Sequence, residues 1–120
     1  PRFVDVRWKY LIILFRSAQL RKRCNDDREL KRHYDSVART IRNRLDDLAA
    51  ANLLSDIATL PHHRCHELEA DRKGQLSIDL RHPYRLILEP ADDPPFRKAD
   101  GGIDWKAVRT IRILEIIDYH

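Results

Sequence analysis

The chain ends on Asp118, Tyr119 and His120, three residue types that can move a proton beside a phosphate. Side chains two positions apart share one face of a strand, so Asp118 and His120 are expected together, with Tyr119 opposite unless the strand end twists. Histidine changes charge near neutral pH, and a tyrosine hydroxyl can donate or accept a proton. With an arginine or lysine to stabilise phosphate charge, these residues suit RNA cleavage in which a ribose 2′-hydroxyl attacks the neighbouring phosphate. The alternative is a polar chain end without a chemical role.

A second polar group, formed by His62, His63, Cys65 and His66, has residue types that bind zinc. Alternate residues share one face of a strand, so only two can meet: His63 with Cys65, or His62 with His66. Two ligands fall short of the four, or three plus water, that zinc sites use. We therefore expect surface histidines beside the end of a helix and no metal.

Glycine-dependent cofactor motifs are also missing from the sequence. The three glycines form neither a dinucleotide-binding nor a Walker-type phosphate-binding pattern, and no Gly-x-Ser-x-Gly elbow occurs. The sequence therefore predicts no cofactor.

The 120 residues have room for one hydrophobic core, so residues 1–120 are expected to form a single domain. The content of 42% hydrophobic and 35% charged residues is typical of a soluble globular protein. Residues 1–60 hold 13 basic and 8 acidic side chains, whereas residues 61–120 hold 10 and 11. The positive surplus of the first half favours an anionic partner, either nucleic acid or an acidic protein.

Two features bear on the cellular compartment. The longest apolar run, Tyr10–Phe15, lies between Lys9 and Arg16 and is far shorter than the roughly 20 residues of a membrane helix. Cys24 and Cys65 are too few for the disulfide framework of a small secreted domain. We expect reduced thiols, a cytoplasmic location and no membrane contact.

The first half of the chain has the pattern of one strand followed by helices. Residues 10–15 form an apolar strand, and Ser17 stands where a helix requires a capping hydroxyl. The helix that follows is expected to break at Asp26 or Asp27 into two short ones. After a second cap at residues 35–36, an apolar stripe of helical period indicates another helix, made by Val37, Ala38, Ile41, Leu45 and Leu48.

From Pro61 onward the pattern alternates with period two, which indicates a sheet. Strands are expected over residues 64–69, 75–80, 84–89 and 108–119, with turns at 71–74 and 82–83 and a long loop over 90–105. The hairpin of the middle strands is expected to have one face toward water. The prediction is an α+β fold, with a helical hairpin packed on a curved, mostly antiparallel sheet of four to five strands. Residues 1–10 are a possible N-terminal extension, in which Val4, Val6 and Trp8 alternate well enough to add a strand.

Five segments together resemble a known family. They are Arg64-Cys65-His66-Glu67-Leu68 with Asp71-Arg72-Lys73-Gly74-Gln75-Leu76-Ser77, Tyr84-Arg85-Leu86-Ile87-Leu88-Glu89-Pro90, and Asp100-Gly101-Gly102-Ile103-Asp104-Trp105 with Ile113-Leu114-Glu115-Ile116-Ile117-Asp118-Tyr119-His120. In this order they resemble HigB-type toxins of the RelE/ParE superfamily, also called plasmid maintenance system killer proteins. The resemblance runs from about Leu11 to His120.

This resemblance implies a RelE-like fold and the toxin of a type II toxin-antitoxin system. Such a toxin is a metal-independent endoribonuclease that cleaves messenger RNA on the ribosome and inhibits translation. A HigA-like helix-turn-helix antitoxin holds it inactive, and DNA is contacted only through that antitoxin. By position, the resemblance assigns catalysis to His66, Arg85, Asp118, Tyr119 and His120, with His66 and His120 transferring protons. RNA contacts are expected from Arg72, Lys73 and Arg42.

Two departures keep other functions open. Glu69 stands where related toxins often have a lysine, and His82-Pro83 stands where they often have Gly-Asn. A carboxylate beside a phosphate site repels the substrate, so Glu69 favours a weakened toxin that still binds its antitoxin, unless Arg72 or Lys73 substitutes. A further alternative is a ParE-like toxin that binds DNA gyrase and needs no nuclease residues.

Overall fold

The computed structural model describes residues 10–118. Within this range the chain forms strands and α-helices in the order β1 (Ile12–Phe15), α1 (Ala18–Cys24), α2 (Asp27–Tyr34), α3 (Ala38–Ala50), α4 (Leu54–Ala58), β2 (His66–Glu67), β3 (Leu76–Asp79), β4 (Tyr84–Pro90) and β5 (Thr110–Asp118). Short 3-10 turns cover Asp35–Val37 and Ala70–Arg72. The proposed strand within residues 1–10 lies outside the described residues.

Side-chain caps set the start of the first two helices, as predicted. The Ser17 hydroxyl accepts a hydrogen bond from the Leu20 N–H at the start of α1. The Asp26 carboxylate accepts from the first turn of α2, which separates the two helices. The predicted cap of α3 is wrong, because Asp35 lies in the left-handed region (φ 45°) inside a 3-10 turn and Val37 precedes α3 without a side-chain cap.

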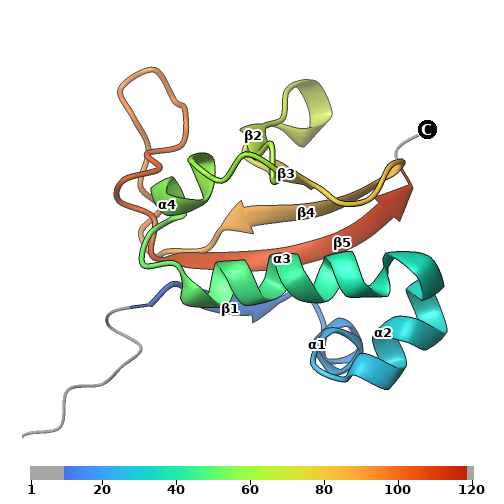
Figure 1. Ribbon diagram of the computed structural model, residues 1–120. Helices are drawn as coiled ribbons and strands as arrows, with labels where there is room; N and C mark the ends of the chain where they lie inside the picture. Colours follow the sequence, from blue (N-terminus) through green and yellow to red (C-terminus); the bar gives the residue numbers. More distant parts are fainter. Residues whose placement is uncertain (1–9, 119–120) are drawn as a thin grey trace, which may run out of the picture.

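The strands form one five-stranded sheet in the order β1-β5-β4-β3-β2. β1 pairs with β5 in parallel, and the other neighbours are antiparallel. Figure 1 shows α3 lying along one face of the sheet, with α1 and α2 beside it. This confirms the α+β class and a sheet that is mostly antiparallel; the parallel β1–β5 pair makes it mixed, the helical layer holds α1, α2 and α3, and α4 was not predicted.

The core lies between α3 and the sheet. The predicted stripe of α3 is confirmed: Ile41, Leu45 and Leu48 are buried, and they belong to one cluster with Leu86 and Leu88 of β4. Removing each such side chain from water contributes about 1.5–3 kcal/mol. This packing fixes the sheet from the helical side and leaves its other face to carry polar groups.

We call the sheet face that points away from α3 the open face. Strand pairing places on it His66, Ser77, Asp79, Arg85, Ile87, Glu89, Arg112, Glu115 and Ile117. The expectation of a wet face is wrong at its centre, because Ser77 and Ile87 are fully buried. Ser77 and Ile87 lie in one row with Glu115 of β5, which accepts a hydrogen bond from Arg72 in the turn before β3.

No helix within residues 10–118 has the length and apolar character needed to cross a bilayer.

Candidate functional site

The structure brings two of the predicted catalytic residues to the open face. His66 lies on β2 opposite Ser77, and Arg85 lies on β4 opposite Asp79. Asp118, at the end of β5, is exposed and pairs with Tyr84, which packs against the core. Strand alternation thus places Asp118 on the other face from Arg85. Tyr119 and His120 lie outside the described residues, so their roles stay predictions.

The His66 ring has a defined proton arrangement. Its Nδ1 lies 2.9 Å from the backbone carbonyl oxygen of Arg64. A carbonyl can only accept a hydrogen bond, so Nδ1 carries the proton and donates it. In the neutral imidazole the lone pair is therefore on Nε2, and the exposed His66 side chain can present it to a ligand as a base.

Arg85 is held by a carboxylate on the neighbouring strand. Its Nη1 donates to Asp79 Oδ1 at 2.5 Å, and the second oxygen of Asp79 lies 3.4 Å from Nε of Arg64. The Asp79 and Arg85 side chains are 21% and 33% exposed, whereas that of Arg64 is 77% exposed. One partly buried carboxylate therefore joins two guanidinium groups beside His66.

Helix α3 fixes the backbone that supports this cluster. Arg44 of α3 donates to the carbonyl oxygens of Asp79 (3.0 Å) and His62 (3.2 Å). Asp79 N–H donates to the His63 carbonyl at 2.7 Å. The His63 ring is buried, with Nε2 2.8 Å from Asp47 of α3, which corrects the prediction that it is a surface histidine.

A metal reading of this histidine-rich segment finds no support in the geometry. Among residues 10–118, no three His, Cys, Asp or Glu side chains are grouped so that they could hold a metal ion. His63 is committed to Asp47, and burial raises the pKa of the neighbouring Cys65 thiol to about 12, which disfavours the thiolate that zinc requires.

The predicted RNA-binding residues Arg72 and Lys73 lie at the turn before β3. Arg72 Nη1 donates to Gln75 (2.9 Å) and to Glu115 (3.1 Å), so this arginine is paired within the open face. Lys73 is exposed and lines a groove of about 350 Å³ together with Glu69, Arg97 and other residues of the long loop. Glu69 therefore shares that groove with the cations of Lys73, Arg97 and Lys98 and with the acidic side chains of Glu67 and Asp100.

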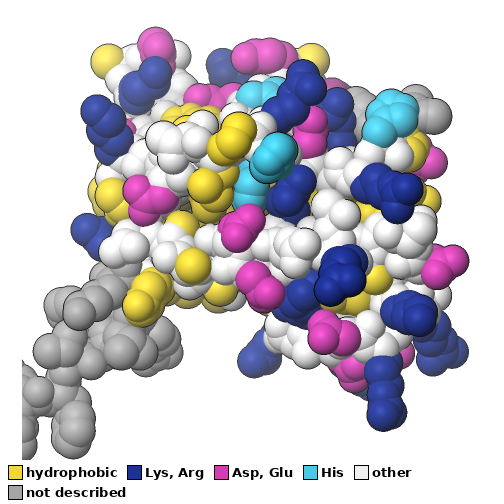
Figure 2. Space-filling view, viewed as in Figure 1, with side chains coloured by type: hydrophobic (Ala, Val, Ile, Leu, Met, Phe, Trp, Pro, Cys, Tyr) yellow, Lys and Arg dark blue, Asp and Glu magenta, His cyan; other side chains and the backbone are white. Residues whose placement is uncertain are grey.

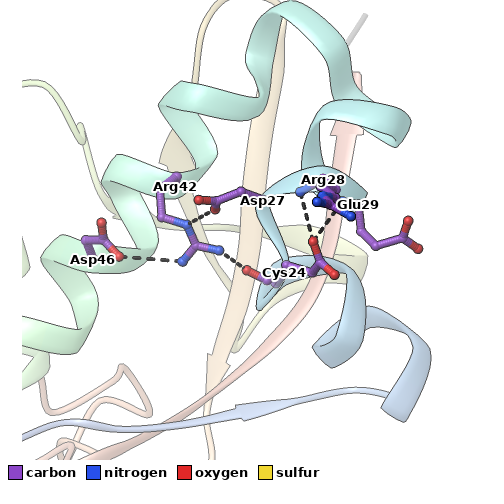
Figure 3. A network of polar contacts seen from close by, with 7 residues as sticks. Cys24, Asp27, Arg28, Glu29, Arg42 and Asp46 are labelled. Atoms are coloured by element: carbon purple, nitrogen blue, oxygen red, sulfur yellow. Dashed lines mark hydrogen bonds and ion pairs between the residues drawn. The ribbon is translucent and has the colours of Figure 1, made fainter.

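The third predicted RNA-binding residue, Arg42, is not part of this assembly. It belongs to α3 on the helical side, where its guanidinium contacts Asp27 (3.0 Å), Asp46 (3.5 Å) and the carbonyl oxygen of Cys24 (Figure 3). The last contact satisfies a carbonyl at the end of α1 and ties α1 to α3. The structure therefore gives Arg42 a place in the helical layer.

Sequence reasoning missed Arg64 and Asp79 as members of the site. A signal was present in the spacing. Arg64 stands two positions before His66, and Asp79 stands two positions after Ser77, which is the spacing of side chains on one strand face. What was absent from the sequence was the register that sets Arg64 beside Asp79 and Asp79 beside Arg85. Register depends on tertiary packing and turn geometry.

Comparison of this chain with protein-family models, with curated proteins and with solved structures finds no match.

Proposed function

We propose that this chain is the toxin of a type II toxin-antitoxin system and cleaves messenger RNA on the ribosome. The observation that carries the proposal is the proton arrangement of His66, whose Nε2 lone pair belongs to an exposed ring on the same sheet face as Arg85. The resemblance to HigB-type toxins supports it, because it assigns catalysis to His66 and Arg85. A RelE-like topology is part of this proposal.

The chemistry needs one base, one acid and a cation. His66 Nε2 takes the proton of a ribose 2′-hydroxyl, and the freed oxygen attacks the adjacent phosphorus. Arg85 stabilises the added negative charge on the phosphoryl oxygens. The bond to the 5′-oxygen then breaks, and an acid protonates that oxygen, which leaves a cyclic phosphate and a 5′-hydroxyl. The resemblance makes His120 the proton-transfer partner of His66, so we assign the acid to His120.

The spacing of His66 and Arg85 is compatible with His66 acting as the base and Arg85 stabilising the phosphoryl oxygens. They lie two strands apart and two residues along, which corresponds to roughly 12 Å between Cα atoms for regular strands. The imidazole and the long guanidinium side chain extend from the same face and shorten that distance. A phosphodiester between them can contact both.

The first prediction tests His66 as the base. His66→Ala should lower the rate of ribosome-dependent messenger RNA cleavage by about 10²–10⁴-fold, the usual contribution of general acid–base catalysis. His62→Ala is the matched control, because His62 is exposed and in its described hydrogen bond its backbone carbonyl accepts from Arg44. Cleavage would be measured on messenger RNA with purified ribosomes. Unchanged cleavage by His66→Ala, or equal cleavage of naked RNA, contradicts the proposal.

A second function, antitoxin binding with weakened nuclease activity, is favoured by the carboxylates of the open face. Asp79, Glu115 and Glu89 each bind an arginine there, the last through Arg112 at 2.9 Å. An RNA phosphate must compete with these carboxylates for the guanidinium groups. In the same assay, a wild-type chain that binds its antitoxin but does not cut RNA would support this second function.

A further inference from the structure

We propose that Arg64 and Arg85 form a single phosphate-binding clamp and that Asp79 is the positioning residue that sets their spacing. The phosphate is the phosphodiester of single-stranded RNA, and in this respect the inference rests on the proposed function. Neither the sequence motifs nor the resemblance assigns a role to Arg64 or Asp79.

The clamp is built from two neighbouring strand positions and one residue in the segment before β2. Asp79 of β3 lies between Arg64, which precedes β2, and Arg85 of β4. Its two carboxylate oxygens contact different arginines, Oδ1 with Arg85 and Oδ2 with Arg64. A carboxylate that holds one guanidinium on each side fixes the separation between them.

The arrangement leaves Arg64 able to bind an anion. It contacts Asp79 through Nε, the guanidinium nitrogen nearest the backbone, and its side chain is 77% exposed. Guanidinium groups present several donors in one plane and bind phosphate oxygens in pairs. Arg64 adds a largely exposed positive charge at the outer side of the cluster, which favours an anion over a cation there.

The backbone of Arg64 links this clamp to the proposed base. Arg64 has φ 47°, a left-handed conformation that costs a non-glycine residue energy and persists only when its surroundings impose it. In this conformation its carbonyl oxygen accepts the Nδ1 hydrogen bond of His66 while its side chain contacts Asp79. One residue therefore orients the base through its backbone and contributes a cation through its side chain.

The alternative is that the Arg64–Asp79–Arg85 cluster only joins β2, β3 and β4. The two roles predict different effects of Asp79→Asn. A clamp loses its spacing but gains positive charge, so RNA binds about threefold more tightly while the rate constant of cleavage falls about tenfold. If the cluster is only a structural tie, Asp79→Asn lowers the stability of the fold and does not raise RNA affinity while lowering the rate constant of cleavage.

The experiment measures binding of a short fluorescent single-stranded RNA by anisotropy at several salt concentrations. Arg64→Gln should weaken binding about tenfold and reduce the salt dependence by about 0.7, the value for one phosphate contact on a single strand. Arg64→Lys should recover part of the affinity. Arg39→Gln, which removes an equal charge at an exposed position of α3, should change affinity less than twofold.

Thermal unfolding of each variant establishes that it is folded. Equal losses of affinity in Arg64→Gln and Arg39→Gln, or a wild-type chain that does not bind the RNA, would overturn the clamp. If the wild type fails to cut ribosomal messenger RNA but Arg64→Gln alone weakens binding, the proposed function fails and the clamp stands. If the wild type cuts and neither Arg64→Gln nor Asp79→Asn alters binding or cleavage, the clamp fails and the function stands.

Discussion

Cys24 and Cys65 are the residues whose protonation burial changes most. Burial raises the pKa of Cys24 from 9.0 to about 11, against smaller opposing effects of Arg42 and Arg23, and it raises that of Cys65 to about 12. Both thiols therefore stay protonated in the folded chain at pH values where the unfolded chain has lost those protons. Folding stability from this source is complete below pH 9 and is lost as pH rises toward 11–12.

The second prediction follows from the direction of these two pKa shifts. Between pH 9 and 11 the free energy of unfolding should fall with pH, by up to about 1.4 kcal/mol per pH unit for each thiol. Urea unfolding of the wild type and of Cys24→Ala/Cys65→Ala at several pH values would measure it. The difference in the free energy of unfolding between the two proteins gives the contribution of the thiols, because the lysines and tyrosines that titrate in the same range are present in both. A difference that does not change with pH would show that the thiols are not desolvated.

At the scale of elements, the long loop before β5 is held to β2 by one side chain. Glu67 of β2 accepts hydrogen bonds from the indole N–H of Trp105 (2.9 Å) and from the backbone N–H of Ile103 (3.3 Å). Ile103 is fully buried and also forms an isolated bridge with Arg97. The loop therefore has a fixed base, while its outer residues, from Asp93 to Gly101, are exposed.

The third prediction concerns this attachment. Glu67→Ala should lower the free energy of unfolding by about 1–3 kcal/mol, because the N–H groups of Ile103 and Trp105 lose their acceptor. Trypsin should then cleave faster at Arg97 and Lys98, whose side chains lie in the loop. Glu69→Ala, an exposed glutamate two positions away, is the control. Equal digestion of both variants would mean that Glu67 does not hold the loop.

The sequence predicted the elements that have local signals and missed those that depend on the rest of the fold. Ser17 and Asp26 carry their caps in the sequence, so the starts of α1 and α2 were predictable. Strand β2 was expected over residues 64–69 but pairs only at His66 and Glu67. It is bounded by Arg64 and by Ala70, both with positive φ, which residue type does not reveal. The five-residue α4 is too short to show a helical period.

The candidate site follows the same rule. The residue types of His66 and Arg85 could be predicted, because the resemblance marks them. Their electrostatic partners could not, because Asp79 and Arg64 join them only through the register of β2, β3 and β4. The alternation of β3 predicted a water-facing Ser77, whereas the structure buries this side chain completely.

At the scale of the whole molecule, the two faces of the sheet have different electrostatic character. On the open face, Arg72, Arg85 and Arg112 are each paired with a carboxylate. On the helical side, Lys and Arg side chains project into solvent from α1 and α2, interspersed with acidic ones (Figure 2). The basic side chains of α1 and α2 thus lie away from the proposed chemistry and are suited to contact with a large polyanion.

The fourth prediction separates this docking from catalysis and rests on the proposed function. Lys22 of α1 is exposed, and α1 carries a run of basic residues in its last turn. Lys22→Gln should raise the KM for ribosomal messenger RNA about threefold and leave kcat within about twofold, because a charge at the rim of an interface acts mainly on encounter.

The matched control is Lys106→Gln, which removes the same charge at an exposed lysine in the segment before β5. The KM difference between these variants should shrink as salt rises, because the interaction is solvent-exposed. A fall in kcat with unchanged KM would instead place α1 in the chemistry, and equal KM values would mean that net charge alone, wherever it lies, brings this chain to RNA.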